Sequence, residues 1–102
     1  MKNILLSIHT KYVKEILMGN KHFELRGWIY KQDVKYIYIY SSSIDKKIVA
    51  RFKPINIIKG TPEEVWSIVS SEFGVNEKEY FSYVNTFNYG VIYAIEISNL
   101  EI

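Results

Sequence analysis

Residues 19–28, which read GNKHFELRGW, guide the interpretation of the whole chain. They follow a run with helical spacing and begin with a glycine, a residue that commonly ends helices. We interpret the stretch as a strand, in which successive side chains point to opposite faces. Phe23 and Leu25 share one apolar face. The other face carries polar, charged and aromatic side chains, namely His22, Glu24, Arg26 and Trp28.

This charged strand face has two interpretations. It can present an acid, a base and an aromatic ring to a ligand while the apolar face seals a core. Charges two positions apart are also common on solvated strand faces, where they contribute mainly to solubility. Residue types alone favour the solvated face, and only the surroundings of the strand can support the ligand site.

The composition is that of one compact domain. A chain of 102 residues, 48% hydrophobic and 16% aromatic, can build one core but not two. We therefore expect a single domain over residues 1–102. A net charge of +2 predicts neither strong nucleic-acid binding nor an acidic partner, so polyanion binding would depend on local placement. The only side chains able to grip a phosphate bidentately are Arg26 and Arg51.

Several classes of site are excluded by what the sequence lacks. With no cysteine there is no disulfide, Cys-based zinc site or thiol catalysis, which fits a reducing compartment. Two histidines, His9 and His22, argue against a His-rich metal site, and we expect neither a metal nor a cofactor. The first apolar run ends at Ile8, too short for a signal peptide, and no segment approaches the roughly 20 apolar residues of a membrane span. We expect a cytoplasmic protein that does not contact membranes.

The first half of the chain predicts a strand, a helix and three further strands. Residues 3–8 form a buried first strand, and a helix of two to three turns follows, with Thr10 as its N-cap and Gly19 as its stop. The second strand covers residues 21–28. Residues 36–40 alternate three tyrosines against Ile37 and Ile39, which predicts a third strand. Residues 47–60 fit either one bent strand or two short ones around a proline.

The second half predicts two helices and a last strand. Thr61 to Glu64 supply a cap, a first-turn proline and two acids at the positive end of a helix. Asn76 caps the next helix, in which Glu77 and Glu79 are exposed. The last strand runs from Tyr89 to Ile97. The first of these helices is expected to bury Val65, Trp66, Ile68 and Val69 and to stop at Gly74, and the second to bury Tyr80, Phe81 and Val84.

Helices inserted between strands predict an α+β fold with a mixed sheet. About five strands in this length cannot cover both faces of an open sheet, so we expect a partly closed barrel with two to three flanking helices. The chain ends in NLEI without a polar tail. Either the domain is complete there or a longer protein has been trimmed.

Two features beside residues 19–28 also have two interpretations each. The tyrosines of residues 36–40 form either a half-buried structural surface or a stacking platform for bases. Ser41, Ser42 and Ser43 either bind a phosphate or carboxylate or provide ordinary turn chemistry.

The segment GNKHFELR resembles the G-x-K-x-x-E-x-R signature of the ASCH domain, a group within the PUA-like superfamily. The segments ILLSI, YVKEILMG, IYIYSSS, KKIVARF, TPEEVW and YGVIYAI are similar, in this order, to those of small bacterial and phage members. The resemblance covers residues 3 to 98. It implies a PUA-like barrel with a cleft between the barrel and the helix after the first strand. It also implies binding of RNA or another nucleic acid.

The resemblance implies that the signature residues line this cleft. Lys21 and Arg26 would form an anion-binding pair, and Glu24 would hold Arg26 or accept a hydrogen bond from a base amino group. Trp28 and Tyr40 are candidate stacking partners, and Ser42 is a further candidate ligand-binding residue. Our leading hypothesis is a non-catalytic module that binds RNA or a nucleotide-like ligand. The oligomeric state stays open.

Two other hypotheses remain. One ASCH subgroup resembles a hydrolase that removes an acyl group from a modified cytidine nucleoside with a Lys, a Thr and a distant Glu. Lys21 matches that Lys, but Glu24 stands where the Thr falls, and a carboxylate favours the charged lysine, which is a poor base. If the chain is an enzyme, Lys21 and Glu24 would act on an acylated or modified nucleoside. The third hypothesis is a protein-interaction role, with the tyrosine face meeting a partner.

Overall fold

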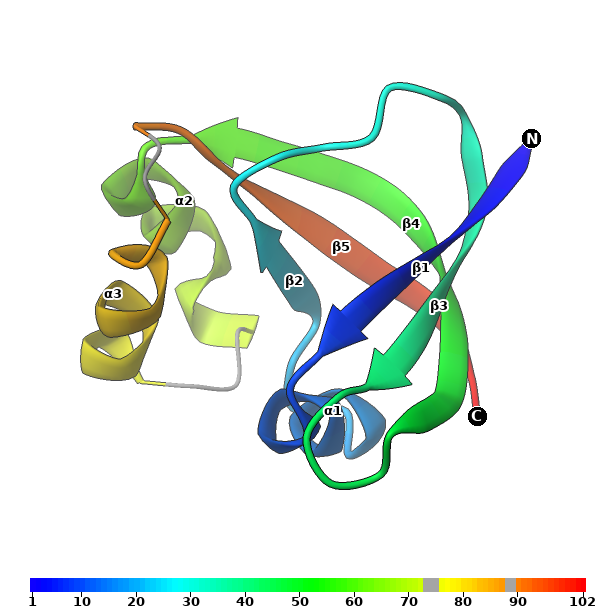
Figure 1. The fold of residues 1–102 in the computed structure, drawn as a ribbon. Coiled ribbons are helices and arrows are strands. Elements are labelled where there is room, and N and C mark those ends of the chain that lie inside the picture. The colour runs from blue at the N-terminus through cyan, green and yellow to red at the C-terminus, as the bar shows by residue number, and fades with distance from the viewer. Residues whose placement is uncertain (73–75, 88–89) are drawn as a thin grey trace.

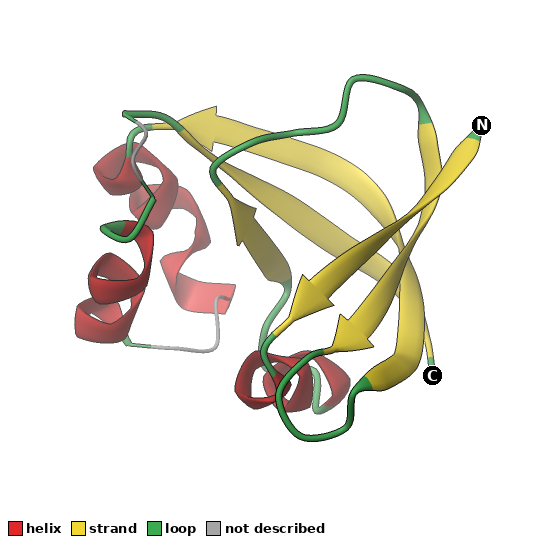
Figure 2. Cartoon of the chain, in the orientation of Figure 1, coloured by secondary structure: helices red, strands yellow, loops and turns green. Residues whose placement is uncertain are grey.

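The computed structural model describes residues 1–72, 76–87 and 90–102. In this part of the chain the elements follow the predicted order, strand, helix, three strands, two helices and strand (Figures 1 and 2). The strands are β1 (Lys2–Ile8), β2 (Phe23–Arg26), β3 (Val34–Ser41), β4 (Lys47–Gly60) and β5 (Ile92–Glu101). The helices are α1 (Thr10–Leu17), α2 (Pro62–Val69), the 3₁₀ turn η1 (Ser70–Glu72) and α3 (Glu77–Val84).

The five described strands form one mixed sheet in the order β1-β3-β4-β5-β2. β1 and β3 run parallel, and the other neighbours are antiparallel. The sheet curls into a half-barrel, with β1 and β2 as its two edge strands (Figure 2). α1 lies at the end of the half-barrel where β1 and β3 stop, while α2 and α3 lie together on another side (Figure 1). The predicted α+β fold with a mixed, partly closed sheet is confirmed.

β4 is one long bent strand, which decides between the two predicted alternatives. Its pairing with β5 shifts register between Arg51 and Lys53 and again between Pro54 and Ile57. A proline has no N–H to donate to a ladder, so a shift beside Pro54 is expected. The bend lets β4 pair with β3 in its first part, up to Phe52, and with β5 from Arg51 to Gly60.

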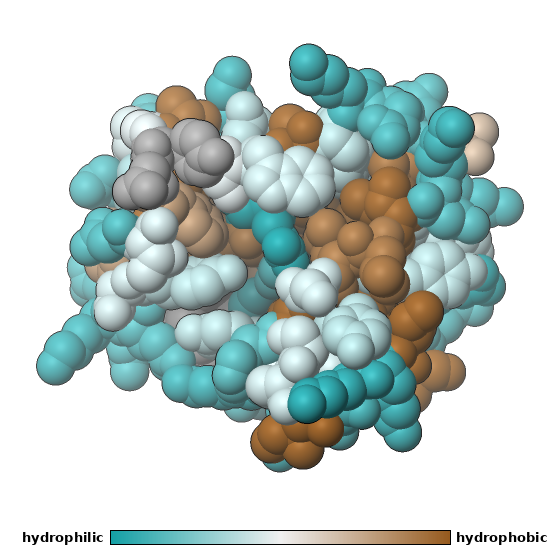
Figure 3. Space-filling view, in the orientation of Figure 1, coloured by the Kyte–Doolittle hydropathy of each residue, from teal (hydrophilic) through white to brown (hydrophobic). Residues whose placement is uncertain are grey.

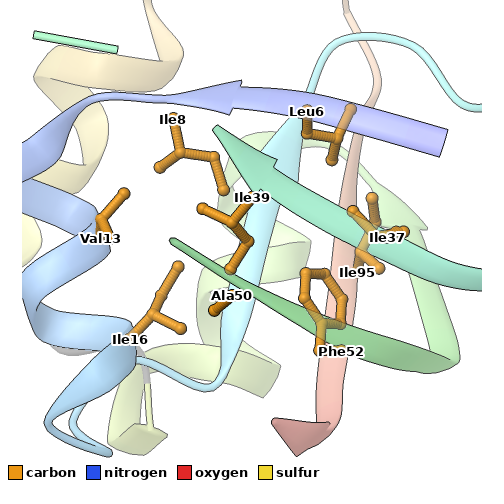
Figure 4. Close-up of a cluster of buried hydrophobic side chains, with 9 residues drawn as sticks. All are labelled: Leu6, Ile8, Val13, Ile16, Ile37, Ile39, Ala50, Phe52 and Ile95. Atoms are coloured by element: carbon orange, nitrogen blue, oxygen red, sulfur yellow. The ribbon is translucent and has the colours of Figure 1, made fainter. Parts of the chain in front are cut away.

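Two hydrophobic clusters pack on the sheet. The first fills the half-barrel and includes Ile39, Phe52 and Ile95 (Figure 4). The second joins β2 and β5 to α2 and α3 and includes Leu25 and Ala94. β5 contributes to both clusters, which explains why its sequence is apolar on both faces. Each fully buried side chain of this size stabilises the fold by roughly 1.5–3 kcal/mol.

The first helix begins one residue earlier than predicted. His9 is the N-cap of α1, and its Nδ1 accepts a hydrogen bond of 3.1 Å from the backbone N of Lys11. Thr10, predicted as the cap, lies inside the helix and is 1% exposed. Its hydroxyl instead lies 2.7 Å from Oγ of Ser41 and accepts from the backbone N of Ile44 at 3.0 Å. A tertiary partner for the hydroxyl therefore replaced the local cap.

Two further predictions need correction, and two others cannot be compared with the structure. β2 is shorter than residues 21–28, because its ladder with β5 runs only from Phe23 to Arg26. In α2, Ile68 is 60% exposed and Trp66 is half-buried, so the buried stripe consists of Val65 and Val69. A helix that packs one face on a core buries a narrow stripe. The predicted stop at Gly74 and strand start at Tyr89 lie outside the described residues.

The ends of β5 and α3 show why local patterns were insufficient. β5 continues beyond Ile97 to Glu101, since its last residues pair with the first half of β4. Glu79 is half-buried rather than exposed, because its carboxylate forms an ion pair with Lys11 of α1. The Asn76 cap of α3 is confirmed by a 2.8 Å hydrogen bond from the backbone N of Glu79 to Oδ1 of Asn76.

Candidate functional site

Lys21 and Glu24 form a buried ion pair at the start of β2. Each side chain is 3% exposed, and Nζ of Lys21 donates to Oε1 of Glu24 at 2.8 Å. Gly19, at φ +81°, turns the chain from α1 toward Lys21 in a conformation that favours glycine. Glu24 pairs opposite Ile95 on β5, so it shares the face of the first hydrophobic cluster. A carboxylate on this face requires the cations that surround it.

Arg26 binds the second oxygen of the same carboxylate. Its Nη2 donates to Oε2 of Glu24 at 2.9 Å and to the backbone carbonyl of Ser7 at 2.7 Å. The first bond lies within β2, and the second reaches across to β1, the opposite edge of the sheet. The Arg26 side chain is 19% exposed, and its buried Nε has no hydrogen-bond partner among the described residues. Arg26 therefore joins β2 to β1 across the open seam between these two edge strands, and its buried Nε–H is left without an acceptor among the described residues.

Two tyrosines lie over this Lys21–Glu24–Arg26 cluster. Nζ of Lys21 is 5.4 Å from the ring centroid of Tyr12 on α1, and that ring is 5.5 Å from the ring of Tyr83 on α3. Burial and the nearby charge of Glu24 raise the pKa of Tyr83 to about 12, against an opposing effect of Arg26. Both phenols therefore stay neutral near pH 7, since burial and the Glu79 carboxylate also raise the pKa of Tyr12.

The two tyrosines also border a pocket of about 350 Å³ between α1 and α3. The ion pair of Lys11 with Glu79 joins the two helices beside it. In the space-filling view, the surface between α3 and β1 is indented, and the base of the indentation is hydrophilic (Figure 3). The pocket is lined by Tyr12, Asn76, Lys78, Glu79, Ser82 and Tyr83.

Sequence reasoning missed Tyr12 and Tyr83 as site residues. The sequence indicated Tyr12 only as one of the apolar positions of a helix. It does pack partly against the first cluster, but its ring also lies near Lys21. Tyr83 had no local signal, because its approach to Glu24 depends on how α3 packs. An aromatic residue nine positions before the signature lysine is the one hint that the sequence offered for Tyr12.

The structure brings together Lys21, Glu24 and Arg26, but it places the other candidates differently. Trp28 lies two residues beyond β2 and is 50% exposed. Tyr40 alternates with Ile39 and lies on the outer face of β3, opposite to the face that Glu24 shares with the first cluster. Ser42 is half-buried at the end of β3, where its backbone N donates to the carbonyl of Ile8 at 2.9 Å.

The neighbouring serines perform turn chemistry. The Ser41 hydroxyl contacts Thr10 and donates to Oδ2 of Asp45 at 2.9 Å. Oγ of Ser43 accepts from the backbone N of Thr10 at 3.2 Å. These bonds fasten the start of α1 to the turn between β3 and β4.

No group of three or more His, Cys, Asp or Glu side chains among the described residues could hold a metal ion. Within the same residues, none of the helices has the length and apolar character needed to cross a membrane.

Comparisons with known proteins agree with the fold. No protein-family model and no curated protein matches the sequence. Among solved structures, the ASCH protein from Zymomonas mobilis matches with a TM-score of 0.83 and 22% identity, covering 96% of this chain and 68% of that chain. A Tyr-to-Phe variant of that protein matches with a TM-score of 0.83 and 21% identity, covering 97% of this chain and 70% of the variant. A Ser-to-Ala variant of the same protein matches with a TM-score of 0.82 and 22% identity, covering 96% of this chain and 68% of the variant.

The five described strands and their helices thus define an α+β half-barrel with a buried Lys–Glu–Arg cluster at its seam. This fold is that of ASCH proteins, as the GNKHFELR resemblance implied. At these identities the likeness concerns the fold, and what the site binds has to be argued from its own residues.

Proposed function

We propose that this chain is a binding module for RNA or a nucleotide-like ligand, with the ligand contacting Arg26 and the pocket beside it. The observation that carries the proposal is the buried Nε of Arg26, which lacks an acceptor among the described residues. A buried donor left without a partner is costly. A phosphate oxygen or a base edge would supply the missing acceptor.

The signature residues then have different tasks. Lys21 already donates to Glu24 and is almost fully buried, so its charge serves to hold that carboxylate. Glu24 in turn orients Arg26, which is the more exposed of the two cations. This division differs from the anion-binding pair that the sequence suggested. Arg26 is the residue that meets the ligand, and the Lys21–Glu24 pair positions it.

The aromatic rings around the pocket support a nucleotide-like ligand. Tyr12 and Tyr83 are neutral, partly buried and close to the cluster, and aromatic faces of this kind stack on unpaired bases. Trp28 remains a candidate partner because half of its surface is exposed at the end of β2. We also propose a cytoplasmic location, in keeping with the cysteine-free sequence.

Hydrolysis of a modified nucleoside is less well supported. A base at Lys21 would need a free nitrogen beside the substrate, whereas Nζ of Lys21 donates a 2.8 Å hydrogen bond to Glu24 and both side chains are 3% exposed. Incubation with a panel of acylated nucleosides tests this alternative. Turnover by the wild type that is lost in Lys21→Met, with the fold retained, would replace the binding proposal by the hydrolase.

Binding is tested by calorimetric titration of nucleoside monophosphates and short single-stranded RNAs. Arg26→Gln should weaken binding by about tenfold or more, the loss expected for a charge-assisted hydrogen bond. Lys14→Gln, which removes an exposed cation of α1, is the matched control and should bind like the wild type. Thermal unfolding verifies that each variant is folded. A folded Arg26→Gln protein with wild-type affinity would overturn the proposal.

A further inference from the structure

Three cations gather on the outer face of the sheet, away from the Lys21–Glu24–Arg26 cluster. The guanidinium carbon of Arg51 lies 3.9 Å from the ring centroid of Tyr36, which is a stacking distance. Nζ of Lys35 and Nζ of Lys53 lie 5.6 and 5.7 Å from the same centroid. Three positively charged groups therefore lie around the ring of Tyr36 on a solvated surface.

The charges of this group are only partly balanced. Arg51 forms an ion pair with Glu101, Nε to Oε2 at 2.9 Å, and its Nη1 donates to the hydroxyl of Tyr38 at 3.2 Å. Neither Lys35 nor Lys53 has a carboxylate within ion-pair distance in the part of the chain that the structure describes. Three like charges with one counter-charge leave a local surplus equal to the net charge of the whole chain, +2. Such a surplus suits a polyanion.

The same face carries aromatic and apolar side chains beside the cations. β-sheet register places Leu5 of β1 and Arg51 of β4 on either side of Tyr38, and Ser7 and Ile48 on either side of Tyr40. Leu5 and Ile48 are each 55% exposed, and with Tyr38 they border a shallow hollow of about 350 Å³. Figure 3 shows apolar side chains gathered over β1 and β3.

We infer that the outer face of β1, β3 and β4 is a second contact surface, one for single-stranded nucleic acid. Lys35 and Lys53 contact phosphates, and Tyr38 and Tyr40 stack on bases above the apolar floor. A groove that combines positive charge with aromatic faces is how single strands are bound without sequence preference. Cations without a counter-charge would attract either a nucleic acid or an acidic protein. The aromatic rings favour the nucleic acid, because its bases can stack on them.

This surface leads toward the Lys21–Glu24–Arg26 cluster. Tyr40 pairs with Ser7 on β1, and the carbonyl of Ser7 accepts the hydrogen bond from Arg26. From the position of Tyr36 to that of Tyr40 is four residues of strand, roughly 13 Å. One strand of nucleic acid can thus run along the outer face and reach the seam. This continuity rests on the proposed function, whereas the outer-face contact itself does not.

The test measures binding of a fluorescent oligouridylate of about 12 nucleotides at several salt concentrations. Lys35→Gln/Lys53→Gln should lower the affinity and reduce the slope of log K against log salt by about 1.4, or about 0.7 for each lost phosphate contact. Lys14→Gln/Lys59→Gln removes the same charge from exposed positions elsewhere and should keep the wild-type slope. Tyr40→Leu, which removes a ring but no charge, should weaken binding by about tenfold with an unchanged slope.

The outcomes separate the two sites. Mononucleotide binding should be unchanged in Lys35→Gln/Lys53→Gln and weakened in Arg26→Gln. If Arg26→Gln has no effect while the outer-face variants lose oligonucleotide affinity, the proposed function fails and the second surface stands. Equal slopes and affinities for the two double variants would overturn the second surface. So would a wild type that does not bind the oligonucleotide at low salt.

Discussion

Nη2 of Arg26 on β2 donates a 2.7 Å hydrogen bond to the backbone carbonyl of Ser7 on β1. These strands lie at opposite edges of the sheet and are not paired with each other by backbone hydrogen bonds. The Arg26 side chain therefore supplies a link between the two edges. An exposed edge carbonyl is a group that sheets usually have to protect. Nη2 of Arg26 donates to both this carbonyl and the Glu24 carboxylate. A ligand that binds Arg26 would therefore lie close to both groups.

Arg26 should therefore contribute to stability as well as to binding. We expect Arg26→Gln to lower the free energy of unfolding by about 1.5–3 kcal/mol, the range for hydrogen bonds to charged groups. Urea unfolding measures this change. Lys14→Gln on the exposed side of α1 should stay within about 0.5 kcal/mol of the wild type. Equal stabilities of the two variants would show that the seam contact is not needed for the fold.

Glu24 should be the most sensitive residue of the cluster, because its carboxylate pairs with both Lys21 and Arg26. Glu24→Gln leaves Lys21 buried without its carboxylate, which should cost about 3–5 kcal/mol. Lys21→Met leaves Glu24 with Arg26 and should cost less. The double variant Lys21→Met/Glu24→Gln should recover much of the loss, since the pair is removed together. A double-mutant cycle in urea checks this order, and purely additive effects would contradict it.

Stability at high pH should report on Tyr83. Its pKa is raised to about 12 in the folded protein, against about 10 when unfolded. The folded state then holds the phenol proton more tightly, so this contribution to stability is complete below about pH 10 and is lost as the pH rises toward about 12. The fall in unfolding free energy across this window should be smaller in Tyr83→Phe than in the wild type. Identical pH profiles would argue against a buried phenol beside Glu24.

The hydroxyl of Thr10 should matter more than that of Ser42. Thr10→Val deprives the backbone N of Ile44 and Oγ of Ser41 of their partner in a buried network, which should cost about 1–3 kcal/mol. Ser42→Ala, one residue along the same strand end, should change stability by less than about 0.5 kcal/mol. Chemical denaturation of both variants compares them directly. If Ser42→Ala weakens ligand binding at unchanged stability, Ser42 regains its place as a site residue.

Several features of the fold could be predicted from local sequence alone. Thr61 and Glu64 form their capping box, with hydrogen bonds of 2.8 and 3.2 Å, because both partners lie within one helical turn. Gly19 ends α1 for an equally local reason, its positive φ. Alternation predicted that Ile37 and Ile39 lie on one face of β3 and three tyrosines on the other, as observed. These features depend on residues at most a few positions apart.

The candidate site depended on contacts between distant parts of the chain. The spacing of Lys21, Glu24 and Arg26 placed three charges on one short segment, but it could not show that Glu24 lies opposite Ile95 and is almost fully buried. Lys21 and Arg26 were expected to bind an anion together. In the structure Lys21 is buried in an ion pair with Glu24, and Arg26 is the more exposed cation. Tyr40 is separated from the cluster because it lies on the outer face of β3, whereas Glu24 shares the face of Ile95.

What the sequence determined by itself was therefore the kind and order of the elements, because caps, turns and alternation act over a few residues. What only the tertiary structure decided was which side chains share an environment. The parallel pairing of β1 with β3, the Ser7 acceptor of Arg26 and the approach of Tyr83 all join residues far apart in the chain. Such contacts form through packing of the whole core, and no local pattern encodes them.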